Sequence, residues 1–150
     1  MATLKTHRFP VRVRWIGGKR TVASVPGKHD LEIATPPEFH GGVEGVWSPE
    51  DLLVASVATC FAVTLVSLTR RRSIPLRALG VEAAGDVTQR PDGRYGFVAV
   101  ALRVEVETEA GFEGELRGAA ADAERSCLVS ASLDTPVHLH VDVRTATAAA

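Results

Sequence analysis

The stretch from Ser48 to Arg72 constrains this chain most, because it has the pattern of one long apolar helix. Ser48 is a favourable N-cap, and Pro49 suits the first helical position. Glu50 and Asp51 place negative charge in the first turn, and Asp51 stands where a capping box carries an acid. No residue from 52 to 69 is charged, and three arginines follow at the end where cations are favourable.

A helix that is apolar on every face is buried, either in a protein core or in a bilayer. Its uncharged part reaches the lower edge of a membrane span, which takes roughly 17–25 residues. However, it contains several small polar residues, and strand-like sequence with turns flanks it on both sides. We therefore predict a central helix covered by sheet, with help from a second chain.

Length and charge narrow the remaining possibilities. The 150 residues predict a single domain, 1–150, and their 17 basic and 18 acidic residues nearly cancel. Nothing therefore indicates a nucleic-acid or membrane-surface partner. The N-terminal sequence has no apolar h-region, which predicts a cytoplasmic protein.

The rest of the chain alternates between strand and helix patterns. Phe9, Val11, Val13 and Trp15 alternate with Pro10, Arg12, Arg14 and Ile16, which predicts a half-buried first strand with its basic residues toward solvent. The order is β-β-β-α-β-β-α-α-β, an α+β fold with antiparallel sheet. The predicted strands are 9–16, 21–25, 31–34, 79–88, 95–107 and 137–144, with further helices over 111–126 and 127–133.

The two cysteines are the residues best suited to chemistry, and they lie in separate predicted helices. They are a redox pair, two buried small residues or metal ligands. A zinc site needs about four ligands, and no Cys-x-x-Cys or His-x-x-x-His motif accompanies these two cysteines. Cys127 stands near a predicted helix start, where the positive end of the helix lowers a thiol pKa. Cys60 lies among apolar residues, so local sequence alone favours Cys127 as the nucleophile.

Several motifs together resemble the OsmC/Ohr family of osmotically inducible and organic hydroperoxide resistance proteins. They are Trp15, the PPEFHGG loop, the SPEDLL helix start, Cys60 and the ERSCLVSASL segment, and they extend over nearly the whole chain. The resemblance implies an OsmC-like fold, with antiparallel sheets around a long buried central helix in an intertwined homodimer.

The resemblance also implies a mechanism and roles. Cys60 is the peroxidatic thiolate, Cys127 the resolving thiol and Glu50 a polar partner at the site. Cys60 attacks the peroxide and becomes a sulfenic acid, Cys127 condenses with it to a disulfide, and an external dithiol reduces that bond. No metal or organic cofactor is implied.

Two departures from the family's peroxidases bear on this mechanism. Their activating arginine follows the first strand in a Gly-Gly-Arg-Asp-Gly-like turn, where this chain has Lys19 and then Arg20. A reactive Cys60 in apolar surroundings is expected to need such a cation, and we favour Arg20. The second cysteine of those members precedes proline, whereas Leu128 follows Cys127 here.

Geometry limits how Glu50 acts, because ten helical residues separate it from Cys60 by about 15 Å along the axis. The two meet only if the helix breaks near its start or if the glutamate comes from another chain. Phe61 and Phe39 are candidate walls of an apolar pocket. His138 and His140 share one face of the last strand, where they are solvent-exposed or form half of a metal site.

The leading hypothesis is a thiol-dependent peroxidase that reduces organic hydroperoxides, and hydrogen peroxide less well. The alternative is an OsmC-fold binding protein for a small apolar or electrophilic ligand, in which both cysteines are inert.

Overall fold

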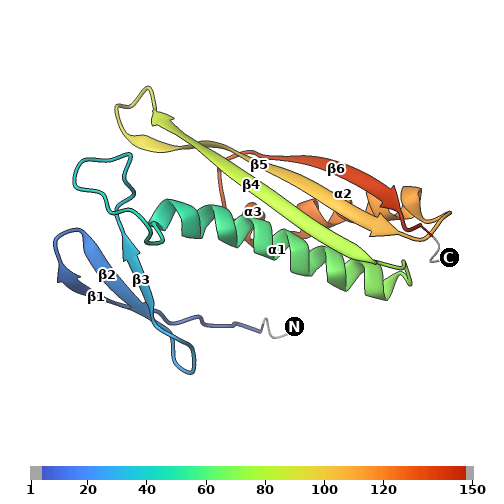
Figure 1. Cartoon of the computed structure of the whole chain (residues 1–150), viewed down its shortest axis with the longest axis horizontal. Coiled ribbons are helices and arrows are strands. Elements are labelled where there is room, and N and C mark those ends of the chain that lie inside the picture. The colour runs from blue at the N-terminus through green and yellow to red at the C-terminus, as the bar shows by residue number, and fades with distance from the viewer. Residues whose placement is uncertain (1–4, 148–150) are drawn as a thin grey trace. The chain divides into compact units, whose positions relative to one another are not determined.

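The computed structural model describes residues 5–147. The chain divides into two compact units, Met1–Leu52 and Leu53–Ala150, which are described in turn. The long helix α1 (Pro49–Arg71) begins in the first unit and runs through the second, as Figure 1 shows. The assignment of one domain to the whole chain stays a prediction.

The N-terminal unit is a three-stranded antiparallel sheet in the order β1-β2-β3. Its strands are β1 (Arg12–Gly17), β2 (Arg20–Ser24) and β3 (Leu31–Ala34). The prediction of a half-buried first strand is wrong for this chain, because Trp15 is 70% exposed and Val11 and Val13 are also exposed. The alternation exists, but the described residues do not cover the apolar side of β1.

The start of α1 confirms the capping box. The Ser48 backbone N–H donates to the Asp51 carboxylate at 2.9 Å, and the Asp51 N–H donates to the Ser48 hydroxyl at 3.0 Å. Aspartate therefore does here what glutamate or glutamine usually does. At the other end Ser73 takes a left-handed conformation with φ 55°, and the Ile74 N–H returns to the Thr69 carbonyl at 2.9 Å. The two bonds at the start and the one at the end fix where the helix begins and ends.

The second unit contains a sheet in the order β4-β5-β6. The long hairpin of β4 (Ala78–Gln89) and β5 (Tyr95–Thr108) is antiparallel, as predicted. Strand β6 (Val137–Thr145) pairs with β5 in parallel, so the expectation of a purely antiparallel sheet is wrong. In sequence, the helices α2 (Glu113–Ser126) and α3 (Leu128–Ala131) connect β5 to β6. This connection brings the chain back so that β6 can run parallel to β5.

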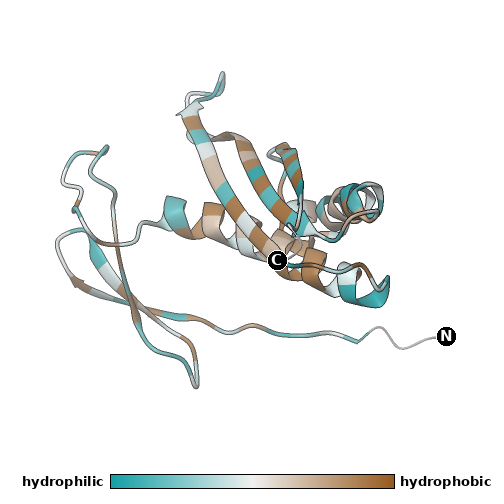
Figure 2. Ribbon diagram, turned by 45° about the vertical axis from the view of Figure 1, so that its right-hand side comes forward, coloured by the Kyte–Doolittle hydropathy of each residue, from teal (hydrophilic) through white to brown (hydrophobic). Residues whose placement is uncertain are grey.

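The core of this unit lies between one face of the sheet and the helices. Alternate residues of β5 are buried there and pack with one side of α1 and the alanine-rich side of α2. The strands alternate between apolar and polar residues, as the colours of Figure 2 show. Gly85 allows the close approach of α1, since a Cβ there would lie 2.8 Å from a Val54 methyl.

Helix α1 is buried on one side only within this chain. Val57, Phe61 and Leu65 are fully buried, whereas Val63 is 63% exposed and Val66 is also exposed. By length and composition alone α1 could span a membrane, a property that core helices of soluble proteins share. The single chain therefore covers one side of α1, uncharged surface remains on the other, and the help expected from a second chain stays a prediction.

We predict that this uncharged surface of α1 is covered by a second copy of the chain. Val63→Glu should then weaken association, because it places a charge in an apolar contact. His138→Glu adds the same charge on an exposed strand position and should leave the association unchanged. Light scattering at micromolar concentration measures both, and a wild-type protein that is a stable monomer would contradict the prediction.

Candidate functional site

The structure brings the two cysteines together, although 66 residues lie between them in sequence. Cys60 is half-buried in the middle of α1, and Cys127 is fully buried at the N-cap of α3. Both are thiols, and the Cys127 side chain is hydrogen-bonded to the Cys60 sulfur. This is the neighbourhood that a redox pair requires.

The first turn of α3 supplies further contacts to the same sulfur. The backbone N–H groups of Leu128 and Val129 hydrogen-bond to Cys60. These are two of the amides that the start of a helix leaves without partners in the helix itself. From the sequence we expected the positive end of this helix to stabilise the Cys127 thiolate. In the structure its amides bind the Cys60 sulfur instead.

The environment of Cys60 acts on its pKa in two directions. Burial raises the pKa of the thiol, because it disfavours the charged form. Hydrogen bonds from the Val129 amide, the Cys127 side chain, the Leu128 amide and the Thr64 side chain lower it. The hydrogen bonds outweigh burial, so the pKa of Cys60 lies below its ordinary value.

The cation expected beside Cys60 stays a prediction, and the pKa of this thiol is already lowered without one. The groups that lower its pKa are uncharged donors, and all of them belong to the same unit as Cys60. The departure at position 128 also takes on a chemical meaning. A proline after Cys127 would have no N–H, so Leu128 supplies a donor that a Cys-Pro sequence lacks.

The other predicted site residues lie in the N-terminal unit. Arg20 begins β2, and its guanidinium pairs with Glu32 of β3 at 2.8 Å. Lys19, in the turn before it, donates to the backbone carbonyl of His40. Both cations therefore have partners within their own unit, and their roles at a thiol stay predictions.

Glu50 lies in the first turn of α1, which continues without a break from Pro49 to Arg71. A break in the helix is thus excluded as the way for Glu50 to reach Cys60 of the same chain. One oxygen of the Glu50 carboxylate is buried and has no hydrogen-bond partner among the described residues. Such an unpartnered buried oxygen is costly, which leads us to expect a hydrogen-bond donor for it beyond the described residues.

The two candidate pocket walls differ in what the structure allows. Phe61 is fully buried in the hydrophobic core, so it offers no surface to a substrate and the prediction for it is wrong. Its burial with the residues of β5 places it on the side of α1 that faces the sheet, although Cys60 precedes it directly in sequence. Phe39 lies partly exposed in the loop before α1, where a role stays a prediction.

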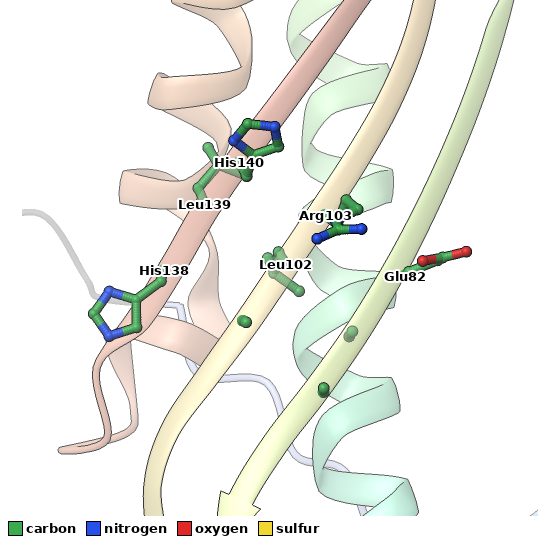
Figure 3. Close-up of a pocket in the computed structure, with 9 residues that line it drawn as sticks. Glu82, Leu102, Arg103, His138, Leu139 and His140 are labelled. Atoms are coloured by element: carbon green, nitrogen blue, oxygen red, sulfur yellow. The ribbon is translucent and has the colours of Figure 1, made fainter.

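The histidines lie on the outer face of the second sheet, away from the core. His138 and His140 project from the edge strand β6 and line a shallow groove with Arg103 and Glu82 (Figure 3). The Nε2 atom of His140 lies 3.4 Å from Oδ1 of Asp142. Within residues 5–147, no group of three or more His, Cys, Asp or Glu is placed to hold a metal ion.

Sequence reasoning missed the three uncharged donors Thr64, Leu128 and Val129. Thr64 had a detectable signal, because it follows Cys60 by four residues and so lies on the same side of a helix. The two amides carry no sequence signal of their own, since every residue except proline has an N–H. Their role follows from the placement of α3 beside the middle of α1 (Figure 1).

Comparison with known proteins agrees with this fold. The chain belongs to the OsmC-like protein family, whose pattern it matches over residues 42–142. It is 24% identical to the uncharacterized protein YmaD of Bacillus subtilis over 141 residues, which cover 91% of this chain and 93% of YmaD.

Two solved structures show the same fold. An OsmC-like protein of unknown function from Vibrio cholerae has a TM-score of 0.83 at 16% identity, covering 91% of this chain and 100% of that one. An organic hydroperoxide resistance protein OsmC from Legionella pneumophila has a TM-score of 0.74 at 22% identity, covering 93% and 98%. The predicted family and α+β OsmC-like fold are therefore confirmed.

The contribution of the Leu128 amide can be tested with one substitution. Leu128→Pro removes this N–H, and proline is accepted here because Leu128 is the first residue of α3 and Cys127 is extended, with ψ 114°. We expect the pKa of Cys60 to rise, because the thiolate loses a donor. The pH dependence of Cys60 alkylation by iodoacetamide, followed by peptide mass spectrometry, measures it.

Leu128→Ala is the matched control, since it keeps the N–H and changes only an exposed side chain. Equal alkylation midpoints in the proline and alanine variants would show that this amide does not stabilise the thiolate.

Proposed function

We propose that this protein is a thiol-dependent peroxidase that reduces organic hydroperoxides, with Cys60 as its nucleophile and Cys127 as its resolving thiol. The observation that carries the proposal is the convergence of Cys127 and two α3 amides on the Cys60 sulfur. Membership of the OsmC-like family, and the similarity to a protein named for organic hydroperoxide resistance, support a peroxide-related redox role.

The proposed reaction proceeds in three steps. The Cys60 thiolate attacks the hydroxyl oxygen of the hydroperoxide, so that an S–O bond forms, the O–O bond breaks and the leaving alkoxide takes a proton from water to become the alcohol. The Cys127 sulfur then attacks the Cys60 sulfenic acid, which forms the disulfide and releases water. An external dithiol reduces the disulfide and restores both thiols.

The contacts of Cys60 fit the first two steps. A lowered pKa increases the fraction of the thiolate, which is the form that reacts. The hydrogen bond between the cysteine side chains means that the resolving thiol is already adjacent when the sulfenic acid forms. The uncharged stretch of α1 around Cys60 favours alkyl hydroperoxides over hydrogen peroxide as substrates.

Arg20 and Glu50 are proposed as the charged members of the site, contributed across a homodimer. Arg20 is about half-exposed. An exposed ion pair such as Arg20–Glu32 contributes about 0–1 kcal/mol to the free energy of folding, so Arg20 can exchange Glu32 for another partner. The unpartnered oxygen of Glu50 would accept a guanidinium N–H. Lys19 is the alternative cation from the same turn.

No metal or organic cofactor enters this proposal, and its only partners are a second copy, the peroxide and a dithiol. A dithiol-dependent cycle works where thiols are kept reduced, which supports a cytoplasmic location and a role in the oxidative stress response. Cell fractionation tests the location, and recovery with secreted or membrane fractions would exclude it.

The proposal predicts that one equivalent of an alkyl hydroperoxide joins the two cysteines. Intact mass should fall by two hydrogens, and a dithiol should restore it with turnover of further peroxide. Cys60→Ser should abolish turnover, whereas Cys127→Ser should accumulate a sulfenic acid at Cys60, which dimedone traps. Two thiols that survive excess peroxide would instead favour the small-ligand binding protein with inert cysteines.

A further inference from the structure

Thr64 differs from the other hydroxyl residues of α1 in what it contacts. Hydroxyls in helices commonly donate to a backbone carbonyl three or four residues earlier. Four on this helix do so: Ser56 to Leu53, Thr59 to Ala55, Ser67 to Val63 and Thr69 to Val66, at 2.7–3.0 Å. The Thr64 side chain is hydrogen-bonded to the Cys60 side chain instead.

The helix geometry accounts for this contact. Thr64 follows Cys60 by four residues on an unbroken helix, so their side chains are neighbours on one side of α1. Side chains of a helix lean toward its N-terminus, which directs Thr64 back over Cys60. Both residues are half-buried, so water competes less for the sulfur than at an exposed position.

The Thr64 hydroxyl completes a set of donors around the sulfur. The amides of Leu128 and Val129 approach from α3, and Thr64 approaches from the helix that carries Cys60 itself. A thiolate accepts hydrogen bonds but donates none, so each donor favours it over the thiol. A donor that belongs to the same helix also limits how the Cys60 side chain can rotate.

We propose that Thr64 is a positioning residue of the thiol site, whose hydroxyl holds the Cys60 sulfur toward the first turn of α3. The proposal deepens the proposed function, because it concerns the same nucleophile. It assigns to one side chain of α1 a role that neither the family resemblance nor the site residues predicted from the sequence include.

The test is the alkylation midpoint of Cys60 in Thr64→Val, which removes the hydroxyl and keeps the branched shape. We expect the midpoint to rise by about one pH unit, which makes the thiolate fraction about tenfold smaller at pH values below the midpoint. The midpoint is the measured quantity because a thiolate of higher pKa is also a stronger nucleophile, which partly masks a change in rate. Thr64→Ala should show the same rise, and it serves if valine impairs folding.

Two control variants make the result specific. Thr64→Ser keeps the hydroxyl and should retain the wild-type midpoint. Thr59→Val removes a hydroxyl that is bonded to the Ala55 carbonyl, and it should also leave the midpoint unchanged. A wild-type midpoint in Thr64→Val and Thr64→Ala, or an equal rise in Thr59→Val, would overturn the proposal.

Alkylation involves no peroxide, so this test is separate from that of the proposed function. A protein without peroxidase activity whose Thr64→Val midpoint rises would retain the positioning role and lose the enzymatic one. An active peroxidase whose midpoint does not respond to Thr64 would lose the positioning role alone.

Discussion

The candidate site depends on the hydrogen bonds that end at the sulfur of Cys60. They come from the amides of Leu128 and Val129, the side chain of Cys127 and the side chain of Thr64. Burial alone would raise the pKa of this thiol, and these bonds reverse the effect. Uncharged donors of the second unit therefore lower the pKa of Cys60, and a contribution from a cation stays a prediction.

The fold of the second unit serves to place these donors. A long hairpin and helix α2 follow α1, and α2 ends at Ser126, directly before Cys127. Cys127 is extended, so the chain starts a new helix in a new direction, and the first amides of α3 are left to bind the sulfur. The parallel return of β6 along β5 then closes this unit.

Local patterns were sufficient to predict much of this structure. The capping box at Ser48 and Asp51, the order of the elements and the long hairpin are all governed by neighbouring residues, and the structure confirms them. Features that depend on distant parts of the chain were predicted less well. The direction of β6, the exposure of Trp15 and the burial of Phe61 depend on which surfaces meet, and no local pattern encodes that.

The site illustrates the same division. Both cysteines were found from the sequence because their residue type carries the chemistry, and their contact confirms that they are neighbours. The direction of the α3 amides depends on packing between helices, so the sequence assigned them to the wrong cysteine. The roles of Arg20 and Glu50 stay predictions, since each lies in the N-terminal unit.

The most direct test of this account is the alkylation midpoint of Cys60 in the double variant Lys19→Ala/Arg20→Ala. If uncharged donors of the second unit stabilise the thiolate, the midpoint stays below that of free cysteine in the same buffer, about 8.5. A midpoint that rises to that of free cysteine or above would show that Lys19 or Arg20, at the turn between β1 and β2, is required, and would contradict the account.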